Sequence, residues 1–331
     1  MNTTPGTTTR PSGQNLALLV LVVGALAISF AGIFAKLAMG DGLLGPLSTG
    51  FWRFAIAIPF LLLAMIVTKP SKPRDLSRKM INPLWLLLPG LLFAGDIAFF
   101  HVAFANTTVS NGTLLANLQV FIVGFLAWWL LKERFKPLFL IGLILAFAGI
   151  WLLVMNDEPG DGASNPRLGN AFAIGTAFWY ASYFLMVKWL RRDFRALEIL
   201  TISTMVGAVT MFLVVILSPQ NLEHLIPFYN DSSAGGFRTE EDISLTRDYT
   251  YAWAYLLLLA VVPQCIGQGC IIWALSRLPV SFSAVVLLLQ PVFAAILGWV
   301  ILSEALNNGQ IIASVVILAG ILLAKLGTPG R

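Results

Sequence analysis

Long apolar runs separated by short polar connections dominate the chain from residue 16 to residue 326. An α-helix needs about 20 mostly apolar residues to cross a bilayer. Ten runs have roughly this length, although several are short or contain a proline. They lie at 16–38, 46–68, 83–105, 109–131, 136–155, 168–190, 196–217, 251–275, 280–302 and 308–326. The pattern predicts an all-α integral membrane protein with ten transmembrane helices.

The composition indicates a chain surrounded by lipid. Hydrophobic residues make up 58% of the 331 residues and charged residues only 11%, and the mean hydropathy is +0.83. A soluble domain carries about 25% charged residues, because its surface must be hydrated. The net charge of +5 sits in short clusters between apolar runs rather than on one face, which argues against a nucleic-acid partner.

Basic residues mark one side of the membrane. They gather in the connections at 69–79, 132–136 and 188–195, which share one side if there are ten spans. Lys and Arg concentrate in cytoplasmic connections, so both termini are expected in the cytoplasm. Acidic residues are common in the opposite connections, at 157–161 and 223–248. The low cysteine content and short tail fit a multi-pass protein of a bacterial inner membrane.

The two halves of the chain repeat each other. The segment that starts at Val109 aligns without a gap on the segment that starts at Val280. Five spans are an odd number, so a second copy must enter the membrane in the opposite sense, and two inverted five-helix repeats are predicted. The basic residues that follow the fourth span are accordingly absent after the ninth. Identical pairs include Leu118/Leu289, Gln119/Gln290, Trp128/Trp299 and Glu133/Glu304.

This organisation divides the chain into five parts. The polar N-terminus, rich in Thr, Pro and Gly, is expected to be a disordered tail. The expected parts are a cytoplasmic tail at 1–15, a first five-helix repeat at 16–155, an outer linker at 156–167, a second repeat at 168–326 with an extracytoplasmic loop at 218–250, and a cytoplasmic tail at 327–331.

Several motifs resemble the paired EamA-like repeats of the drug/metabolite transporter superfamily. Phe51–Phe54 read FWRF, and Gln290–Glu304 read QPVFAAILGWVILSE. A lysine, Lys36 or Lys188, closes the first span of each half. The resemblance covers nearly all of residues 16–326. It implies ten helices, a central cavity shared by the halves, and secondary transport, often export of amino acids or other metabolites.

Two features depart from the family pattern. Val120 stands where the second half has Pro291, so the fourth span is expected to be less kinked than the ninth. The outward segment Ser218–Thr250 is long for the family.

Ionisable side chains inside the spans are the first functional candidates, because each costs roughly 2.5–3.5 kcal/mol at a helix centre. Asp96 is the only carboxylate well inside a span. It either binds a proton or a substrate ammonium group, or it neutralises Arg53. Arg53 either recognises a carboxylate or phosphate, or forms a fixed ion pair or reaches the headgroups. His101 either relays protons or packs with a hydrogen bond.

Uncharged polar and aromatic residues supply further candidates. Asn117, Gln264 and Gln268 lie within spans and suit a cavity wall. Asn117 and Gln268 are better candidates than the repeated Gln119 and Gln290, which can bond between helices. Three aromatic residues of the sixth span either flank a substrate or pack the bundle. The full set of candidates for binding or coupling is Asp96, Arg53, His101, Asn117, Gln268, Trp179, Tyr180 and Tyr183.

A second group of residues recurs in both halves and is expected to support the structure. Lys36 and Lys188 lie near helix ends, where a long side chain readily reaches the headgroups. Glu133 and Glu304 end equivalent helices at opposite faces of the membrane and are expected to tie each helix end to its neighbour. The set comprises Lys36, Lys188, Glu133, Glu304, Gln119, Gln290 and Pro291.

These features favour a secondary transporter that moves small metabolites across the membrane by alternating access. Amino acids or related solutes, and export rather than uptake, are favoured only by the family resemblance. A lipid or lipid-carrier flippase is the main alternative, and a receptor or scaffold without transport is another.

An enzyme is not expected. The chain has no phosphate-binding glycine loop, no carboxylate dyad and no paired histidines within the spans. His224 falls in the predicted outer loop, so neither a metal site nor a cofactor is expected. The expected partners are a small-molecule solute and membrane lipids, with proton coupling and a homodimer left open.

Overall fold

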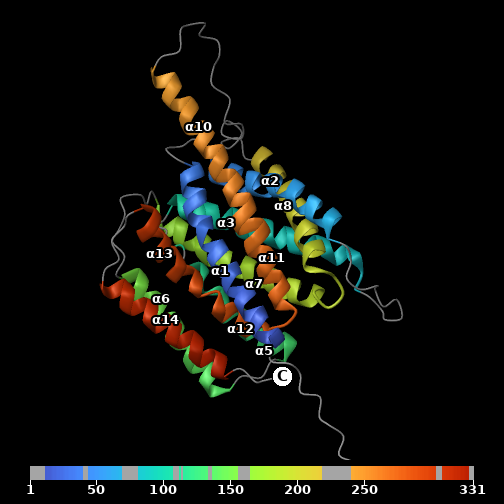
Figure 1. Cartoon of the computed structure of the whole chain (residues 1–331), viewed down its shortest axis with the longest axis vertical. Helices are drawn as coiled ribbons and strands as arrows, with labels where there is room; N and C mark the ends of the chain where they lie inside the picture. Colours follow the sequence, from blue (N-terminus) through green and yellow to red (C-terminus); the bar gives the residue numbers. More distant parts are fainter. Residues whose placement is uncertain are drawn as a thin grey trace, which may run out of the picture.

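The protein is a bundle of α-helices, which confirms the predicted all-α fold. In the computed structural model, helices and short turns make up the described part of the chain, which contains no β-strand. Figure 1 shows the helices packed side by side in one body. The described residues are 12–39, 44–68, 81–106, 112, 115–132, 136–155, 165–217, 240–302 and 308–327.

Some sequence predictions fall outside the described residues. The final part of the predicted outer loop, 240–250, is described and is helical, because a helix begins at Glu240. The segments and residues that lie outside are 1–11 of the first tail, 156–164 of the outer linker, 218–239 of the outer loop, 328–331 of the last tail, Glu133 and Glu304.

The first half contains five membrane-crossing segments. The 3-10 turn η1 leads directly into α3, so the two form one crossing. The elements are α1 (Ser12–Met39), α2 (Pro46–Val67), η1 (Pro83–Leu86), α3 (Leu87–Asn106), α5 (Gln119–Leu131) and α6 (Pro137–Met155).

The second half also has five crossings, which makes ten in the described part of the chain, as predicted. α10, the π-helical η2 and α11 form one continuous crossing, and α12 and α13 form another. Five crossings, α1, α2, η1–α3, α8 and α10–α11, are long and apolar enough to span a membrane by themselves. The elements are α7 (Pro166–Leu190), α8 (Ala196–Ile216), α10 (Glu240–Leu259), η2 (Ala260–Gly267), α11 (Gln268–Leu275), α12 (Val280–Val286), α13 (Leu289–Leu302) and α14 (Asn308–Gly327).

Local sequence signals set several helix boundaries. Pro46 and Pro166 begin α2 and α7, where the missing N–H of proline would have had no helical partner. The side chain of Asn165 caps α7 by accepting a hydrogen bond from Leu168 N at 3.3 Å. Lys132 ends α5 in the left-handed conformation, with φ 54°.

The fourth crossing of each half is interrupted within one residue of the same point of the repeat. Turns at residues 117–118 and 287–288 precede α5 and α13. Pro291 is buried in the first turn of α13, and Val120 takes the equivalent place in α5. A turn at this point therefore forms in the first half without proline, and the expectation that the fourth span is less kinked than the ninth stays a prediction.

Hydrogen bonds between helix ends show which ends share a face of the bundle. Asn165 N donates to Asn106 O at 3.2 Å, which joins the start of α7 to the end of α3. Ile81 N donates to Asp193 Oδ2 at 3.0 Å, which joins the residues before α3 to the turn after α7. Because opposite ends are paired in this way, α3 and α7 are antiparallel.

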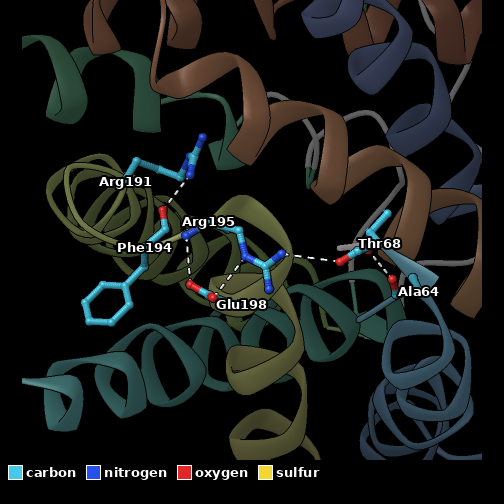
Figure 2. A network of polar contacts seen from close by, with 6 residues as sticks. All are labelled: Ala64, Thr68, Arg191, Phe194, Arg195 and Glu198. Carbon is cyan, nitrogen blue, oxygen red and sulfur yellow. Dashed lines mark hydrogen bonds and ion pairs between the residues drawn. The ribbon is translucent and has the colours of Figure 1, made fainter. Parts of the chain in front are cut away.

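The ends of α2 and α7 lie on one face. Arg195 Nη1, just after α7, donates to Thr68 O at the end of α2 at 3.4 Å (Figure 2). We name this the Arg195 face and the opposite one the Asn106 face. Only residues 40–45 separate the end of α1 from the start of α2, so α1 ends on the Asn106 face.

Contacts between helices of the two halves occur in equivalent pairs, so that each contact has a counterpart in which the two halves have changed places. α3 packs on α7, and α1 packs correspondingly on α10, η2 and α11; α2 packs on its own equivalent, α8. Close approaches repeat as well. A Cβ atom on Gly95 would lie 2.6 Å from Trp179, and one on Gly267 would lie 2.7 Å from Ile28. The halves are thus related by an approximate two-fold axis, as in inverted-repeat transporters.

α6 and α14, equivalent helices of the two halves, cross each other at small residues and lie side by side at one edge of the bundle (Figure 1). A Cβ atom on Gly149 would lie 2.8 Å from Ile317 N, and one on Gly320 would lie 2.4 Å from Ala146 N. Under the sequence repeat, Gly149 and Ala146 correspond to Gly320 and Ile317. The two contacts are therefore equivalent, and these glycines pack within one chain.

Substitution Gly320→Ala tests this crossing. The added methyl group would meet backbone atoms of α6, so we expect a loss of about 1–3 kcal/mol in the free energy of unfolding. Thermal unfolding of the purified protein in detergent measures it. Gly124→Ala is the control, since no atom lies within 4 Å of its Cβ position. Equal melting temperatures for both variants would contradict the close crossing.

Candidate functional site

A group of polar side chains is buried where the two halves meet, and we name it the central polar cluster. Arg53 of α2 and Asp96 of α3 come from the first half, and the other members come from α7, α8, η2 and α11 of the second. Every member is at most 9% exposed. The cluster consists of Arg53, Asp96, Tyr180, Tyr183, Thr204, Gln264 and Gln268.

The cluster lies deep along the helix axes. Asp96 is near the middle of the η1–α3 crossing, and Arg53 follows the start of α2 by seven residues, or about 10 Å. Gln264 belongs to η2, the π-helical stretch that contains Pro263. Proline cannot donate to the helical ladder, so the ladder changes register around it. Such π-helical insertions are frequent at functional sites.

Arg53 is held by a chain of hydrogen bonds. Its Nε donates to Gln264 Oε1 at 3.1 Å, and Gln264 Nε2 donates to Thr204 Oγ1 at 3.1 Å. The guanidinium carbon also lies 6.0 Å from the centre of the Phe93 ring, at the outer limit of a cation–π contact. All three polar residues are buried, so the chain orients the guanidinium group in the bundle.

Asp96 interacts electrostatically with Arg53 but is not in contact with it. The two side chains attract each other, yet the described residues contain no salt bridge between them. Nor does any described residue donate a hydrogen bond to the Asp96 carboxylate, which is 5% exposed. Of the two readings of Asp96, the geometry fits a fixed ion pair less well than a carboxylate available to another group.

Aromatic side chains flank the two charged residues. Tyr183 stacks on Phe93 with ring centres 4.6 Å apart, and Tyr180 lies 5.8 Å from Tyr183. The Tyr183 hydroxyl has no hydrogen-bond partner among the described residues. Tyr180 interacts through its hydroxyl group with the side chain of Gln268, whose Oε1 atom has no partner in the described part of the chain. The cluster therefore offers several buried polar atoms to a ligand.

His101 lies one turn beyond the cluster on α3. Its Nδ1 atom is 2.8 Å from Ile97 O, so the ring packs along its own helix. Its Nε2 atom has no hydrogen-bond partner among the described residues. The side chain is fully buried and close enough to Arg53 for an electrostatic interaction.

The other candidates lie apart from the cluster in the contacts that the structure gives. Trp179 packs against Gly95 and Phe99, which assigns it to the contact between α3 and α7. Asn117 is buried at the break before α5, and Lys36 and Lys188 occupy opposite faces of the bundle. Of the repeat glutamines, Gln119 is buried and Gln290 is half-buried.

Thr204 and the role of Gln264 escaped sequence reasoning. Gln264 was evident as a polar residue within a span, and its position after Pro263 was the available signal. Nothing in the sequence separates Thr204 from other hydroxyl residues of apolar helices. Its contact with Gln264 joins residues 60 positions apart, so only the packed bundle reveals it.

The described residues include no group of three or more His, Cys, Asp or Glu side chains that could hold a metal ion. The two cysteines, Cys265 and Cys270, are free thiols. The chemistry that the cluster itself can supply is hydrogen bonding, charge pairing and proton binding.

The model of the EamA-like transporter family matches residues 15–155 and 167–326, which is most of the chain. The chain belongs to the EamA-like transporter family. The resemblance noted in the sequence is thereby confirmed, and the central polar cluster takes residues from both matched regions. The match and the apolar helices together identify a multi-pass membrane protein.

Other EamA-like proteins of similar length are named as transporters. An uncharacterized transporter of Archaeoglobus fulgidus is 25% identical and aligns over 92% of this chain and 96% of its own. The uncharacterized transporter YyaM of Bacillus subtilis is 22% identical over 94% of both chains. A protein crystal structure with 17% identity has a TM-score of 0.69, covers 95% of this chain and 98% of its own, and shows the same fold.

Substitution Gln264→Leu tests the hydrogen-bonded chain that holds Arg53. We expect a loss of about 1–3 kcal/mol in the free energy of unfolding, because Arg53 Nε would be left without an acceptor. Thr204→Val should cost less, about 0.5–1.5 kcal/mol, since it removes a neutral hydrogen bond. Thermal unfolding followed by tryptophan fluorescence measures both. The double variant should resemble Gln264→Leu alone, and fully additive losses would contradict the chain.

Proposed function

We propose that this EamA-like transporter moves a small polar solute across the membrane by alternating access, with the central polar cluster as its solute site. The observation that carries the proposal is the unjoined pair of Arg53 and Asp96, buried where the two halves meet. The family match and the transporters among its relatives support a small-molecule solute. In inverted-repeat transporters the solute site lies between the repeats near the midplane.

Arg53 is proposed to bind an anionic group of the solute. Gln264 occupies its Nε atom, and the two terminal nitrogens of the guanidinium group have no hydrogen bond to a described residue. A guanidinium edge presents two parallel donors, which match a carboxylate or phosphate. Because the group is only 2% exposed, water competes weakly for it.

Asp96 is proposed to couple transport to protons or to bind a cationic group of the solute. Its carboxylate has no donor among the described residues, and it faces the field of Arg53 without a direct contact. A solute that carries both charges, such as an amino acid, would satisfy both residues at once. Protonation of Asp96 would remove one of those interactions and so link solute binding to proton binding.

The proposed orientation places the Arg195 face in the cytoplasm of a bacterial cell, with both termini inside. The basic connections after α2 and α7 meet on this face, and basic residues concentrate in cytoplasmic connections. Export is the proposed direction, on the strength of the family resemblance alone. The gradients across the membrane decide the direction of any secondary carrier.

Flux in proteoliposomes tests the solute site and the role of Asp96. A mixture of labelled amino acids and other small metabolites would be offered with and without a pH gradient. Wild type is expected to transport at least one solute, with faster flux under the gradient. Asp96→Asn is expected to abolish the dependence on the gradient, because an amide does not take up a proton in this pH range.

Asp193→Asn is the matched control for this experiment. It changes a carboxylate outside the cluster and keeps the oxygen that accepts from Ile81 N. Its flux should respond to the gradient like wild type. Unchanged gradient dependence in Asp96→Asn would contradict the coupling role. Failure of every solute, together with lipid movement between the leaflets, would overturn the proposal in favour of a flippase.

Cysteine labelling in intact cells tests the orientation. Arg192→Cys is exposed on the Arg195 face, and Asn165→Cys is exposed on the Asn106 face. A membrane-impermeant maleimide is expected to label only the residue-165 variant until the membrane is permeabilised. Both variants would carry Cys265→Ala and Cys270→Ala. The reverse pattern of labelling would invert the proposed topology.

A further inference from the structure

The end of α7 is fastened to the end of α11 by Lys188. Its Nζ atom donates to Leu275 O and to Leu278 O, each at 2.6 Å. These carbonyl groups lie at the C-terminal end of a helix, where they lack helical partners and carry partial negative charge. One cation therefore joins two helices of the second half at the Arg195 face.

Arg191 reinforces the same connection. Its Nε donates to Ile272 O at 3.1 Å, and its Nη2 donates to Ser276 Oγ at 3.1 Å. Burial, with nearby Arg277 adding to the effect, lowers the pKa of Arg191 to about 10, so the group remains charged at neutral pH. These bonds close the gap between α7 and α11.

Arg195 extends the network to α2 and α8. Figure 2 shows its bond to Thr68 O beside its ion pair with Glu198, whose Oε1 atom lies 3.0 Å from Arg195 Nε. Glu198 Oε2 also accepts from Arg195 N at 2.9 Å. The end of α7 is thus bonded to the ends of α2, α8 and α11 at the Arg195 face.

The equivalent place on the Asn106 face is not fastened in this way. Lys36 ends α1 as Lys188 ends α7, but it is exposed, and its Nζ atom has no hydrogen bond in the described part of the chain. This end of α1 packs on α10 through Ala31 and Ala35. α1 and α3 make little contact with each other, whereas α7 and α11 are joined.

The repeat identifies the carbonyl groups that Lys36 would meet. A Cβ atom on Gly24 would lie 3.0 Å from Ile271, and one on Gly175 would lie 2.4 Å from Phe99, so Phe99 takes the place of Ile271. In this register Lys36 lies one position from the exact equivalent of Lys188. Counting from that pair, the last turn of α3, Ala103–Asn106, takes the place of Leu275 and the residues that follow it.

We propose that Lys188 and Lys36 are alternating latches, each closing one face of the bundle in turn. The structure has the Lys188 latch closed and the Lys36 latch open. In the opposite conformation, Lys36 binds the carbonyl groups at the end of α3, and Lys188 releases those of α11. This inference rests on the proposed alternating-access function and explains why a lysine recurs at the end of the first helix of each half.

Exchange of the halves is the physical basis of the proposal. In an inverted repeat, each half can adopt the conformation of the other, which turns a bundle closed on one face into a bundle closed on the opposite face. The two conformations must be close in free energy, so a few hydrogen bonds at one face can decide which is populated. A charged hydrogen bond lost from one conformation changes the ratio by roughly tenfold.

Distances between paired spin labels test the latches in the full-length protein. One pair, Arg192→Cys with Arg277→Cys, reports the Arg195 face, and a second, Met39→Cys with Ala105→Cys, reports the Asn106 face. Each pair would be placed in a background with Cys265→Ala and Cys270→Ala, reconstituted in lipid nanodiscs. Lys188→Met keeps the length of the side chain and removes its donors.

Reciprocal changes are the expected result. In Lys188→Met, the Arg195-face distance should lengthen and the Asn106-face distance should shorten, with the ratio of the two populations changed at least about tenfold. Lys36→Met should remove any population with the short Asn106-face distance. Lys188→Arg retains a donor and should restore much of the wild-type distribution.

Two results would overturn the proposal. In the first, Lys188→Met leaves both distributions as in wild type, which makes Lys188 a helix cap alone. In the second, the Arg195-face distance lengthens without any change at the Asn106 face. If Lys188→Met does not fold, Lys188→Gln replaces it: a longer Arg195-face distance together with a shorter Asn106-face distance supports the latch, and unchanged distributions overturn it.

These measurements need no transported solute. Opposite changes in the two distances without any flux would support the latches and contradict the proposed solute transport. Flux without opposite changes in the two distances would support the transporter and contradict the latches.

Discussion

A five-helix unit crosses a membrane an odd number of times, and this constraint governs the arrangement of the whole chain. A second copy of the unit starts on the opposite side, so equivalent helices meet across an approximate two-fold axis. α2 packs on α8 and α6 on α14 for this reason. The same relation makes close contacts recur, as at Gly149 with Ile317 and Gly320 with Ala146.

The central polar cluster also depends on the contact between the two halves. Arg53 and Asp96 come from the first half, but the groups around them come from the second, so the cluster exists only when the halves meet. A guanidinium group buried away from water needs several acceptors. Gln264 meets only part of that need within the described residues, and this unmet capacity is the physical support for a solute site.

Departures from the two-fold relation are as informative as its repetition. A protein whose halves were identical in conformation would be equally open or closed on both faces. Here Lys188 is bonded to the end of α11, whereas Lys36 is exposed at the end of α1. Equivalent residues in unequal surroundings are what one conformation of an alternating pair would show.

The sequence by itself determined the all-α fold, the ten crossings, the repeat and the family, because hydropathy, charge placement and the pairing of Gln119 with Gln290 are read along the chain. It also supplied Arg53 and Asp96 as candidates. Only the tertiary structure decided that they are not joined in a salt bridge, and that Gln264 orients Arg53 across 211 residues of sequence. Such contacts depend on how distant helices pack, which no local pattern encodes.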